Sequence, residues 1–510
     1  MSVKRSLGAG GISALTAIAF TAAAVVFSAA CSDNNSSTAP DTTTKVVADT
    51  LFLGYADTAT KQTTCGNCHV DRQAEWATTK HAHAWADLEG SGHASPACYG
   101  CHTTNGNSNL APDSTGYFAV KANAKPFYQD VQCEACHGPG SHHVAAPGDV
   151  QPLSTIVADT GLTTGCGTCH SGAHDPFVEE WRSSGHGFVE PHALGNASCI
   201  GCHDGTAALK RFDTHAAFIE DTSATWTAIT CAVCHDPHGS SNPAQLRYPI
   251  NTPDLTTNLC MQCHYRNSAP DPTSTRVTPH SPEGPLLLGE AGWIPQNFAD
   301  SSIGVSSHGS DLNPRLCAGC HVNSLTATDN LTGQTIYSVG HRFEALPCLT
   351  PGGAPDTTTT CSDANASFAA CTASGCHATE DAARNAKAAG DARMQYYADQ
   401  IWIDSNANGK VDTTDGGLLA QVKKLFPNEW QTGNVVTVGI GAQFNTALFR
   451  LPGTPEHNPF YAEALAIATI DAVEARYGVS GSSALQTQLQ TRAAALGMKT
   501  QLRSTRAPTR

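Results

Sequence analysis

Apolar residues recur at helical spacing mainly in the last quarter of this 510-residue chain. Helices are predicted at 378–400, 418–426, 459–477 and 482–499. The third has Asn458 as its cap and Pro459 in its first turn. Its buried face is formed by Ala462, Leu465, Ala466, Ile467, Ile470, Ala472 and Val473. Before residue 380 long periodic apolar runs are few, and the chain contains 45 Gly and 28 Pro. Regular secondary structure should therefore be sparse there.

The N-terminus carries an export signal. Lys4 and Arg5 precede an apolar stretch from about residue 7 to 30, which predicts a cleaved signal peptide over residues 1–30. Ser28-Ala29-Ala30-Cys31 resembles a lipobox, so we expect Cys31 to be lipidated and residues 31–60 to form a polar tether. Ordinary cleavage after Ala30, giving a soluble periplasmic or secreted protein, is the alternative. No later segment is long and apolar enough to span a bilayer.

Cysteines follow one pattern along most of the chain. Cys-x-x-Cys-His occurs eight times, and each copy is typical of a c-type haem attachment site, with two thioether cysteines and a proximal histidine ligand to iron. A zinc site would need paired Cys-x-x-Cys knuckles and would not require His after every second Cys. The eight sites are Cys65/Cys68/His69, Cys98/Cys101/His102, Cys133/Cys136/His137, Cys166/Cys169/His170, Cys199/Cys202/His203, Cys231/Cys234/His235, Cys260/Cys263/His264 and Cys317/Cys320/His321, numbered sites 1 to 8 below.

A ninth site is predicted at Cys376-His377. Its second thiol is Cys371, in a C-x4-C-H motif, or Cys361, in a C-x14-C-H motif; the shorter loop costs less closure entropy and is preferred. With Cys371 on the haem, Cys348 and Cys361 would form a disulfide; with Cys361 on the haem, Cys348 and Cys371 would. Two disulfides and no ninth haem is the third alternative. Each one indicates an oxidising compartment.

The attachment sites form a tandem repeat. The first cysteines of sites 1 to 6 are separated by 33, 35, 33, 33 and 32 residues. Trp76…His81 matches Trp181…His186, and each follows the first motif of a three-site unit. We therefore expect trihaem units at 61–150 and 151–245, a diverged module with sites 7–9 at 246–380, and a helical domain at 381–510. The fold class is mostly irregular and helical, with haems supplying the core that side chains do not.

The chain has enough histidines to give every haem iron two histidine ligands. Of 23 His, nine are proximal, and Met is scarce with four residues, so bis-His ligation at low reduction potential is expected. The candidates for distal ligands are His81, His93, His143, His186, His192, His238, His280, His308, His341 and His457. His83, His142, His174 and His215 are expected at the surface or on propionates. Sequence proximity does not say which iron a distal His serves.

One further metal site is predicted near the C-terminus. The segment 404–415 places oxygen donors as a calcium loop does, from Asp404, Asn406, Asn408, the Lys410 carbonyl, Asp412 and Asp415, with Gly409 at the turn. Asp replaces the usual Glu at the last position, which resembles dockerin-type loops. An Asp/Asn-rich turn without metal is the alternative.

The chain resembles the bacterial multihaem c-type cytochromes over about residues 60–380 and at His457. Trp-x4-His, the CxxCHGPGxxH segment at 133–143 and the CxxCHxPHG segment at 231–239 resemble those of the tetrahaem and octahaem cytochromes; the signal, tether and haem number resemble outer-surface cytochromes of metal-reducing bacteria. The resemblance implies about nine c-type haems within tunnelling distance.

The expected function is electron transport rather than enzyme catalysis, at the outer membrane or cell surface. Its partners would be redox proteins or an extracellular acceptor, with membrane attachment through the lipid anchor. A formal net charge of −15 argues against nucleic acid as a partner. Two alternatives are a reductase with one open iron for nitrite, hydroxylamine or a sulfur oxyanion, and a homo-oligomeric cytochrome filament.

Overall fold

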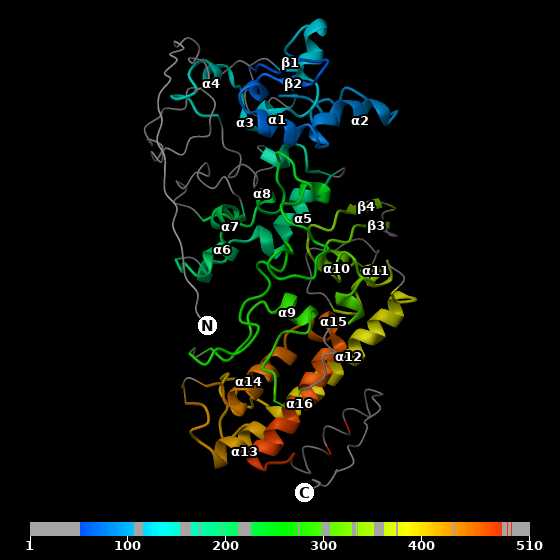
Figure 1. Cartoon of the computed structure of the whole chain (residues 1–510). Helices are drawn as coiled ribbons and strands as arrows, with labels where there is room; N and C mark the ends of the chain where they lie inside the picture. Colours follow the sequence, from blue (N-terminus) through cyan, green and yellow to red (C-terminus); the bar gives the residue numbers. More distant parts are fainter. Residues whose placement is uncertain are drawn as a thin grey trace, which may run out of the picture.

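The structure is a computed structural model that describes residues 52–106, 116–152, 165–212, 226–350 and 362–481, with short internal gaps, and residues 487 and 491. The gaps are 173–174, 194, 274–275, 297, 299–305, 329–332, 334, 374–375, 432 and 434. The predicted signal peptide, Cys31 and most of the helix expected at 482–499 lie outside these residues. Figure 1 shows an elongated molecule with the N-terminal part at one end and the C-terminal helices at the other.

The haem-site region contains short helices joined by irregular segments, as its sequence predicts. The helices are α1 (Val70–Trp76), α2 (Ala84–Gly90), α3 (Cys133–His137), α4 (Ser141–Ala145), α5 (Phe177–Ser183), α6 (Ile200–His203), α7 (Gly205–Phe212), α8 (Cys231–Cys234), α9 (Glu283–Leu287), α10 (Cys317–His321) and α11 (Ala369–Thr372). Strands β1 (Tyr55–Asp57) and β2 (Gln62–Thr63) pair antiparallel, as do β3 (Leu325–Thr328) and β4 (Thr335–Ser338). In the described part of this region, buried apolar side chains form only small separate clusters.

The predicted tether ends earlier than residue 60. Phe52 and Tyr55 are buried, and β1 already belongs to the first unit. Glu134, inside the third attachment motif, accepts hydrogen bonds from the backbone N–H groups of Leu53 (2.9 Å), Gly54 (2.8 Å) and Gly140 (2.8 Å). Because a buried carboxylate must be satisfied, these bonds hold Leu53 and Gly54 against site 3.

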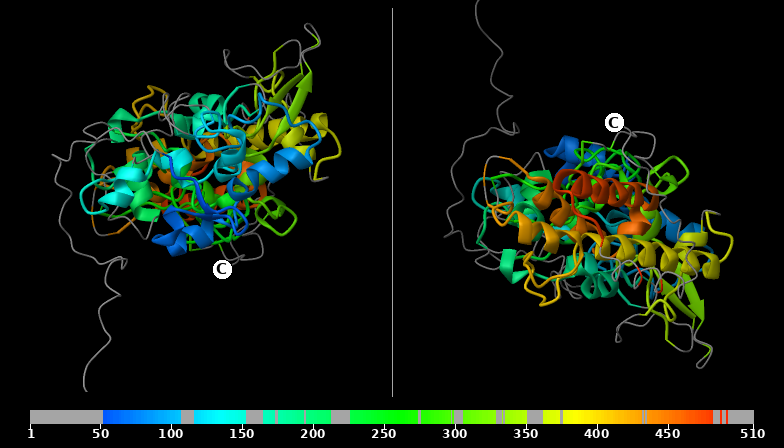
Figure 2. Two further views of the ribbon diagram at one scale, coloured as in Figure 1. Left: turned by 90° about the horizontal axis from the view of Figure 1, so that it is seen from above. Right: turned by 90° about the horizontal axis from the view of Figure 1, so that it is seen from below.

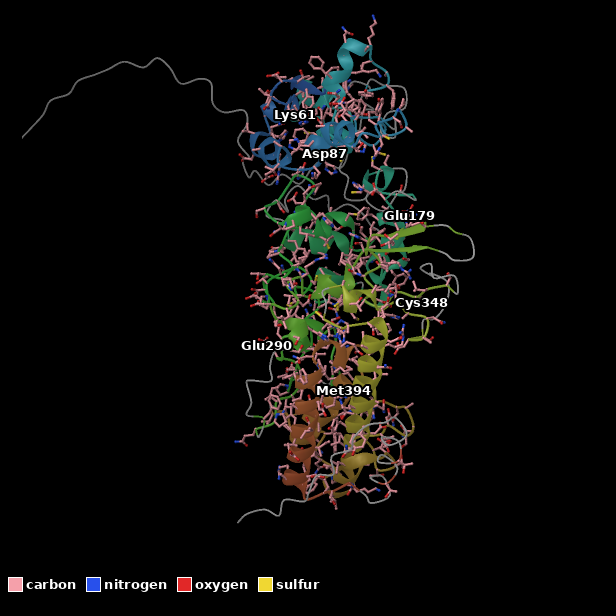
Figure 3. All side chains as sticks on the ribbon, turned by 90° about the vertical axis from the view of Figure 1, so that its right-hand side faces the viewer. Lys61, Asp87, Glu179, Glu290, Cys348 and Met394 are labelled. Carbon is pink, nitrogen blue, oxygen red and sulfur yellow. The ribbon has the colours of Figure 1, made fainter. Side chains whose placement is uncertain are left out.

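The C-terminal part has an ordinary side-chain core. Its helices are α12 (Glu380–Ile401), α13 (Gly417–Leu425), α14 (Val438–Phe449), α15 (Thr454–His457) and α16 (Pro459–Tyr477). The largest apolar cluster of the described residues lies between them and includes Met394, Leu419, Leu448, Leu465 and Val473. Figure 2 shows α12 and α16 lying along each other, and Met394 is labelled among them in Figure 3. Met394 is thus a core residue.

Three of the predicted helices are present with nearly the predicted bounds. The Asn458 side chain caps α16 by accepting from the Tyr461 N–H at 3.2 Å. His457, which directly precedes this cap in the sequence, is the last residue of α15 and does not belong to α16. No described helix is both long enough and apolar enough to cross a membrane.

The repeat identified in the sequence has a structural counterpart. The Trp76 indole donates to the Val131 carbonyl at 2.9 Å, and the Trp181 indole donates to the Ile229 carbonyl at 2.7 Å. In the same way the His81 carbonyl accepts from the Val131 N–H, and the His186 carbonyl accepts from the Ile229 N–H. Each tryptophan therefore fastens the histidine five residues later to the segment before the third attachment motif of its unit.

Candidate haem sites

The attachment motifs fold into single helical turns that gather their reactive groups. In sites 1, 4, 5, 6 and 7 the histidine N–H donates to the carbonyl of the first cysteine, at 2.9 to 3.2 Å. Positions i, i+3 and i+4 share one helix face, so both thiols and the imidazole point to the same side. This arrangement suits two thioethers and a proximal iron ligand on one macrocycle.

The second cysteines of sites 1 and 3 differ in their surroundings, although the motif predicts the same role for both. Cys68 is exposed, whereas its partner Cys65 is half-buried and contacts Cys133 of site 3. The Cys68 N–H donates to the Cys65 carbonyl at 3.1 Å, so the turn holds this cysteine even though the fold does not cover it. Cys136 is half-buried and interacts electrostatically with Cys169 of site 4. The two thiols of site 1 are therefore not equally shielded from solvent. Haem attachment through Cys68 and Cys136 stays a prediction.

The predicted ninth site shares one backbone hydrogen bond with the shorter motifs. The His377 N–H donates to the Cys371 carbonyl at 3.2 Å, as the histidine N–H does in the shorter motifs. Cys371 and Cys376 are free thiols, whereas Cys348 is disulfide-bonded. The alternative disulfide between Cys348 and Cys371 is therefore excluded. Cys361 lies outside the described residues.

Eight of the nine predicted proximal histidines face a second histidine. The ring centres are 6.0 to 6.3 Å apart in the pairs His69–His143, His81–His170, His137–His238, His186–His264, His203–His280, His235–His341, His308–His377 and His321–His457. A histidine nitrogen ligates a metal at about 2.0 Å, so two rings on opposite sides of one metal have centres about 6 Å apart. The spacing is too wide for direct ring contact and fits one iron between each pair.

The ring orientations favour the same ligation. The Nδ1 atoms of His143, His235, His321 and His457 lie 2.6 to 2.9 Å from the carbonyls of Val150, Ala244, Phe343 and Gly453. His308 Nδ1 contacts the Glu456 carbonyl. A backbone acceptor on Nδ1 fixes the tautomer and leaves Nε2 free for the metal.

Burial favours the neutral form of four of the predicted distal histidines. Desolvation lowers the pKa of both His81 and His186 to about 4, and it lowers the pKa of His341 and His457 as well. Neutral imidazole is the form that ligates metal.

Most pairs join different parts of the chain. His81, from the first unit, faces proximal His170 of the second, and His186, from the second, faces His264 of the third module. His238 faces His137 of the preceding unit, while His143 faces His69 of its own unit, so these two histidines have different roles despite their similar motifs. His457 brings the C-terminal helices to site 8.

Two predicted distal ligands are not placed as expected. His93 and His192 are both exposed, and neither ring faces a proximal histidine within the described residues. Both lie shortly before the second motif of a unit, a position that carries no information about the fold. His83 is exposed, as predicted; His174 and His215 lie outside the described residues.

Site 2 differs from the other sites. His102 Nδ1 lies 2.8 Å from the Ala84 carbonyl, so its Nε2 is directed as in the others. Within the residues that the structure describes, no second histidine ring faces it. Trp85, Tyr99 and Tyr117 form an aromatic cluster with ring centres 5.0 to 5.7 Å apart, and Tyr99 lies inside the attachment motif.

Glu180 supports a distal ligand from a distant part of the chain, and no sequence motif indicates this role. Its buried carboxylate accepts from the Val339 N–H at 2.9 Å and the His341 N–H at 2.7 Å. The segment after β4 is thereby held to α5, with His341 facing His235 of site 6.

Glu283 contacts a proximal ligand directly. Its carboxylate oxygen lies 3.3 Å from His264 Nδ1 of site 7. The hydrogen bond between them is the main cause of the raised pKa of His264. A carboxylate partner makes a ligating imidazole more basic than a carbonyl partner does.

Neighbouring attachment sites touch through their thiols. Cys65 of site 1 contacts Cys133 of site 3, Cys101 of site 2 contacts Cys169 of site 4, Cys202 of site 5 contacts Cys263 of site 7, and Cys260 of site 7 contacts Cys317 of site 8. Electrostatic interactions between cysteines or histidines link sites 3 and 4, 4 and 6, 6 and 7, and 8 and 9. The nine predicted sites therefore form one connected set.

The predicted calcium loop is ordered through hydrogen bonds. Asp404 accepts from the Asn408 and Gly409 N–H groups, and Asp415 accepts from the Trp402 indole at 2.8 Å. A backbone bridge between Ile403 and Gly416 closes the loop between α12 and α13. No group of three or more His, Cys, Asp or Glu side chains positioned to hold a metal occurs among the described residues. The calcium site stays a prediction.

Comparison with known proteins gives consistent similarities. The family described as cytochrome c554 and c-prime matches residues 64–138, and the doubled CXXCH motif matches residues 225–269. The multiheme cytochrome MtrA of Shewanella baltica (strain OS185) is 25% identical over 230 residues, covering 40% of this chain and 60% of that protein. This chain thus spans about three fifths of that relative's length.

Two solved structures show limited similarity. The outer cell wall cytochrome OcwA has a TM-score of 0.42 and 18% identity, covering 74% of this chain and 75% of that one. The undecaheme cytochrome from the S-layer of Carboxydothermus ferrireducens has a TM-score of 0.39 and 20% identity, covering 87% and 69%. The attachment motifs and the sequence similarities together show that this chain is a multihaem c-type cytochrome.

Proposed function

We propose that the protein carries electrons along a row of nine haem sites. The observation that supports this most strongly is the set of eight histidine pairs at 6.0 to 6.3 Å, a spacing suited to closed, bis-His irons. When bound, the haems supply reversible one-electron exchange between ferric and ferrous iron. The two histidines of each pair would hold the iron of that site between them, which would leave no room there for a substrate.

The contacts between sites suggest a main route with two branches. Sites 1, 3, 4, 6, 7, 8 and 9 follow one another through thiol contacts and electrostatic neighbours. Site 2 joins this row at site 4, and site 5 joins it at site 7. The row follows the long axis of the molecule from the N-terminal unit towards the C-terminal helices (Figure 1).

A paired deletion tests the route. Replacing Cys231 and Cys234 by Ala removes site 6 from the row, and replacing Cys98 and Cys101 by Ala removes the branch site 2. We expect current through single molecules held between two electrodes to fall at least tenfold without site 6 and to stay near the wild-type value without site 2. Eight haems per chain in each variant is the control for folding. Equal currents in the two variants would refute this route.

A reductase activity at site 2 is the second candidate function. It is favoured by His102, which faces no second histidine within the described part of the chain. An iron ligated only by His102 could take nitrite, hydroxylamine or a sulfur oxyanion. Reoxidation of the reduced protein by one of these compounds, lost in a C98A/C101A variant, would support this activity; no reoxidation would exclude it.

We also propose that the protein is exported and anchored through Cys31, at the outer membrane or cell surface. A disulfide at Cys348 is consistent with an oxidising compartment. We further propose that the loop at 404–415 binds calcium, because its oxygen donors have the required spacing between two helices.

A further inference from the structure

Three arginines gather around site 5. Arg211 donates to the Cys202 thiol of site 5 at 3.5 Å and to the Cys263 thiol of site 7 at 3.1 Å. Arg266 donates to the Ser198 carbonyl at 3.2 Å, beside the first cysteine of the site. Arg266 and Arg276 both interact electrostatically with His280, the histidine that faces proximal His203. The three guanidinium groups therefore lie near both the attachment motif and the distal side of site 5.

Arg211 and Arg266 differ from most other arginines in the molecule. Among the described residues, neither of them forms an ion pair with a carboxylate. By contrast, Arg247 near site 6 pairs with Asp236 at 3.0 Å, and Arg450 in the C-terminal core pairs with Asp399 at 3.1 Å. The chain has 44 acidic residues and only 29 basic ones, so arginines without a carboxylate partner are unexpected in it.

The surroundings of site 5 are open to solvent. Residues 195–198, just before its first cysteine, are exposed, as are Arg211 and Arg276. Helix α6, which carries His203, lies at one side of the elongated body together with α7 (Figure 1). Among the described residues of this neighbourhood, Glu283 interacts with both His280 and His264, and Asp204 is buried with its oxygens accepting backbone N–H groups. Of the charged side chains named here, the three arginines therefore lie beside one carboxylate that interacts with histidines and one that is buried.

The haem propionates do not account for Arg211. In a c-type haem the thioether bonds and the propionates are on different edges of the macrocycle. Arg211 contacts the two thiols, and so lies at the thioether edges of sites 5 and 7, where these sites approach each other.

We propose that site 5 is a lateral port at which a small anionic redox molecule exchanges electrons with the protein. The ligand class is a small molecule carrying carboxylate, sulfonate or phosphate groups, such as a chelated ferric ion, and Arg211, Arg266 and Arg276 attract it. This inference rests on the proposed electron-transport function and adds the place and chemistry of the exchange. When the protein is the donor, one electron passes from a ferrous iron to the acceptor. The iron becomes ferric and the acceptor is reduced by one electron. No bond forms or breaks, and no proton moves.

Screening explains why the partner is small. The net charge of −15 repels an acidic protein, whose charges extend over a wide surface. At physiological ionic strength charges interact over about 8 Å, so a small anion at site 5 responds mainly to the nearby arginines.

The test compares two oxidants of opposite charge. Fully reduced holoprotein is mixed in a stopped-flow instrument with the Fe(III)–EDTA anion or with the hexaammineruthenium(III) cation. The test variant is R266Q/R276Q, which leaves Arg211 in contact with the thiols, and the matched control is R476Q, an exposed arginine at the end of α16. At low ionic strength, removing two charges about 8 Å from the ligand should slow oxidation by the anion about fivefold and speed oxidation by the cation. The redox-inert Ga(III)–EDTA anion should bind the wild type and R476Q, and bind the double variant more weakly, in equilibrium dialysis.

Each other result overturns the inference in a recognisable way. Unchanged rates and unchanged Ga(III)–EDTA binding in R266Q/R276Q would overturn the port while leaving electron transport intact. If the oxidation rates with both oxidants changed in the same direction and the reduction potentials shifted, the arginines would only adjust the potentials of the haems. A wild-type protein that transfers electrons to neither oxidant would refute the proposed function itself.

Discussion

Replacement of Glu180 by Gln should release the distal ligand of site 6. The buried carboxylate accepts from the N–H groups of Val339 (2.9 Å) and His341 (2.7 Å), which hold the segment after β4 to α5. Hydrogen bonds to a charged group contribute about 1.5–3 kcal/mol each. A Gln side chain keeps one acceptor oxygen and turns an NH₂ group towards the other N–H, so at least one of these bonds is lost.

The expected effect is large enough to measure. A loss of about 2–3 kcal/mol raises the population of the released segment by about 30- to 150-fold, at 1.36 kcal/mol per tenfold change. His341 would then leave site 6 in a fraction of the molecules, and that iron would become high-spin and able to bind carbon monoxide when reduced. Electron paramagnetic resonance of the ferric protein, together with carbon monoxide titration of the ferrous protein, measures this fraction.

The control is the neighbouring residue. Glu179 is exposed and, among the described residues, accepts only from the Gly172 N–H at 2.8 Å; Figure 3 labels it at the side of the molecule. E179Q should therefore leave site 6 unchanged. An E180Q protein with the wild-type spin state and stability, or an equal effect of E179Q, would refute the positioning role of Glu180.

Other contacts lead to three further predictions. H457A should convert site 8 to a high-spin iron and lower the melting temperature of the C-terminal helices, whereas H83A, at an exposed histidine, should change neither, as judged by spin-state spectroscopy and calorimetry. W76F and W181F should each lower the free energy of unfolding by about 1 kcal/mol, because each variant loses one indole hydrogen bond at an equivalent position of the repeat. Denaturant titrations measure both losses, and strongly unequal values would argue against that equivalence. If the loop at 404–415 binds calcium with a Kd of about 10⁻⁴ M, then 1 mM calcium stabilises the α12–α13 region by about 1.4 kcal/mol; an equal melting temperature in calcium and in EGTA would refute calcium binding.

The sequence predicted what is local and missed what depends on the tertiary fold. The attachment turns form within five residues, so the motif alone indicates how Cys65 and His69 lie. The distal histidine of a site comes from far along the chain, as His81 does for His170 and His457 does for His321. Their pairing therefore could not be predicted from spacing.

Two other differences have similar physical reasons. Helix α14 was not predicted, since Val438, Gly439 and Gly441 are poor helix formers. Its burial outweighs this low helix propensity. Glycine is needed at 441 because the backbone lies against the Trp293 ring, where a side chain would not fit. Glu180 carries no motif, and its role is visible only once the segment containing His341 is seen beside α5.

Low-temperature electron paramagnetic resonance of the air-oxidised protein, with haem quantified on the same sample, tests the central claim most directly. The account predicts about nine haems per chain, with low-spin ferric signals for eight closed irons and a high-spin signal for one, at site 2. Several high-spin irons, or a haem count well below nine, would contradict the row of closed sites on which the proposed electron transport depends.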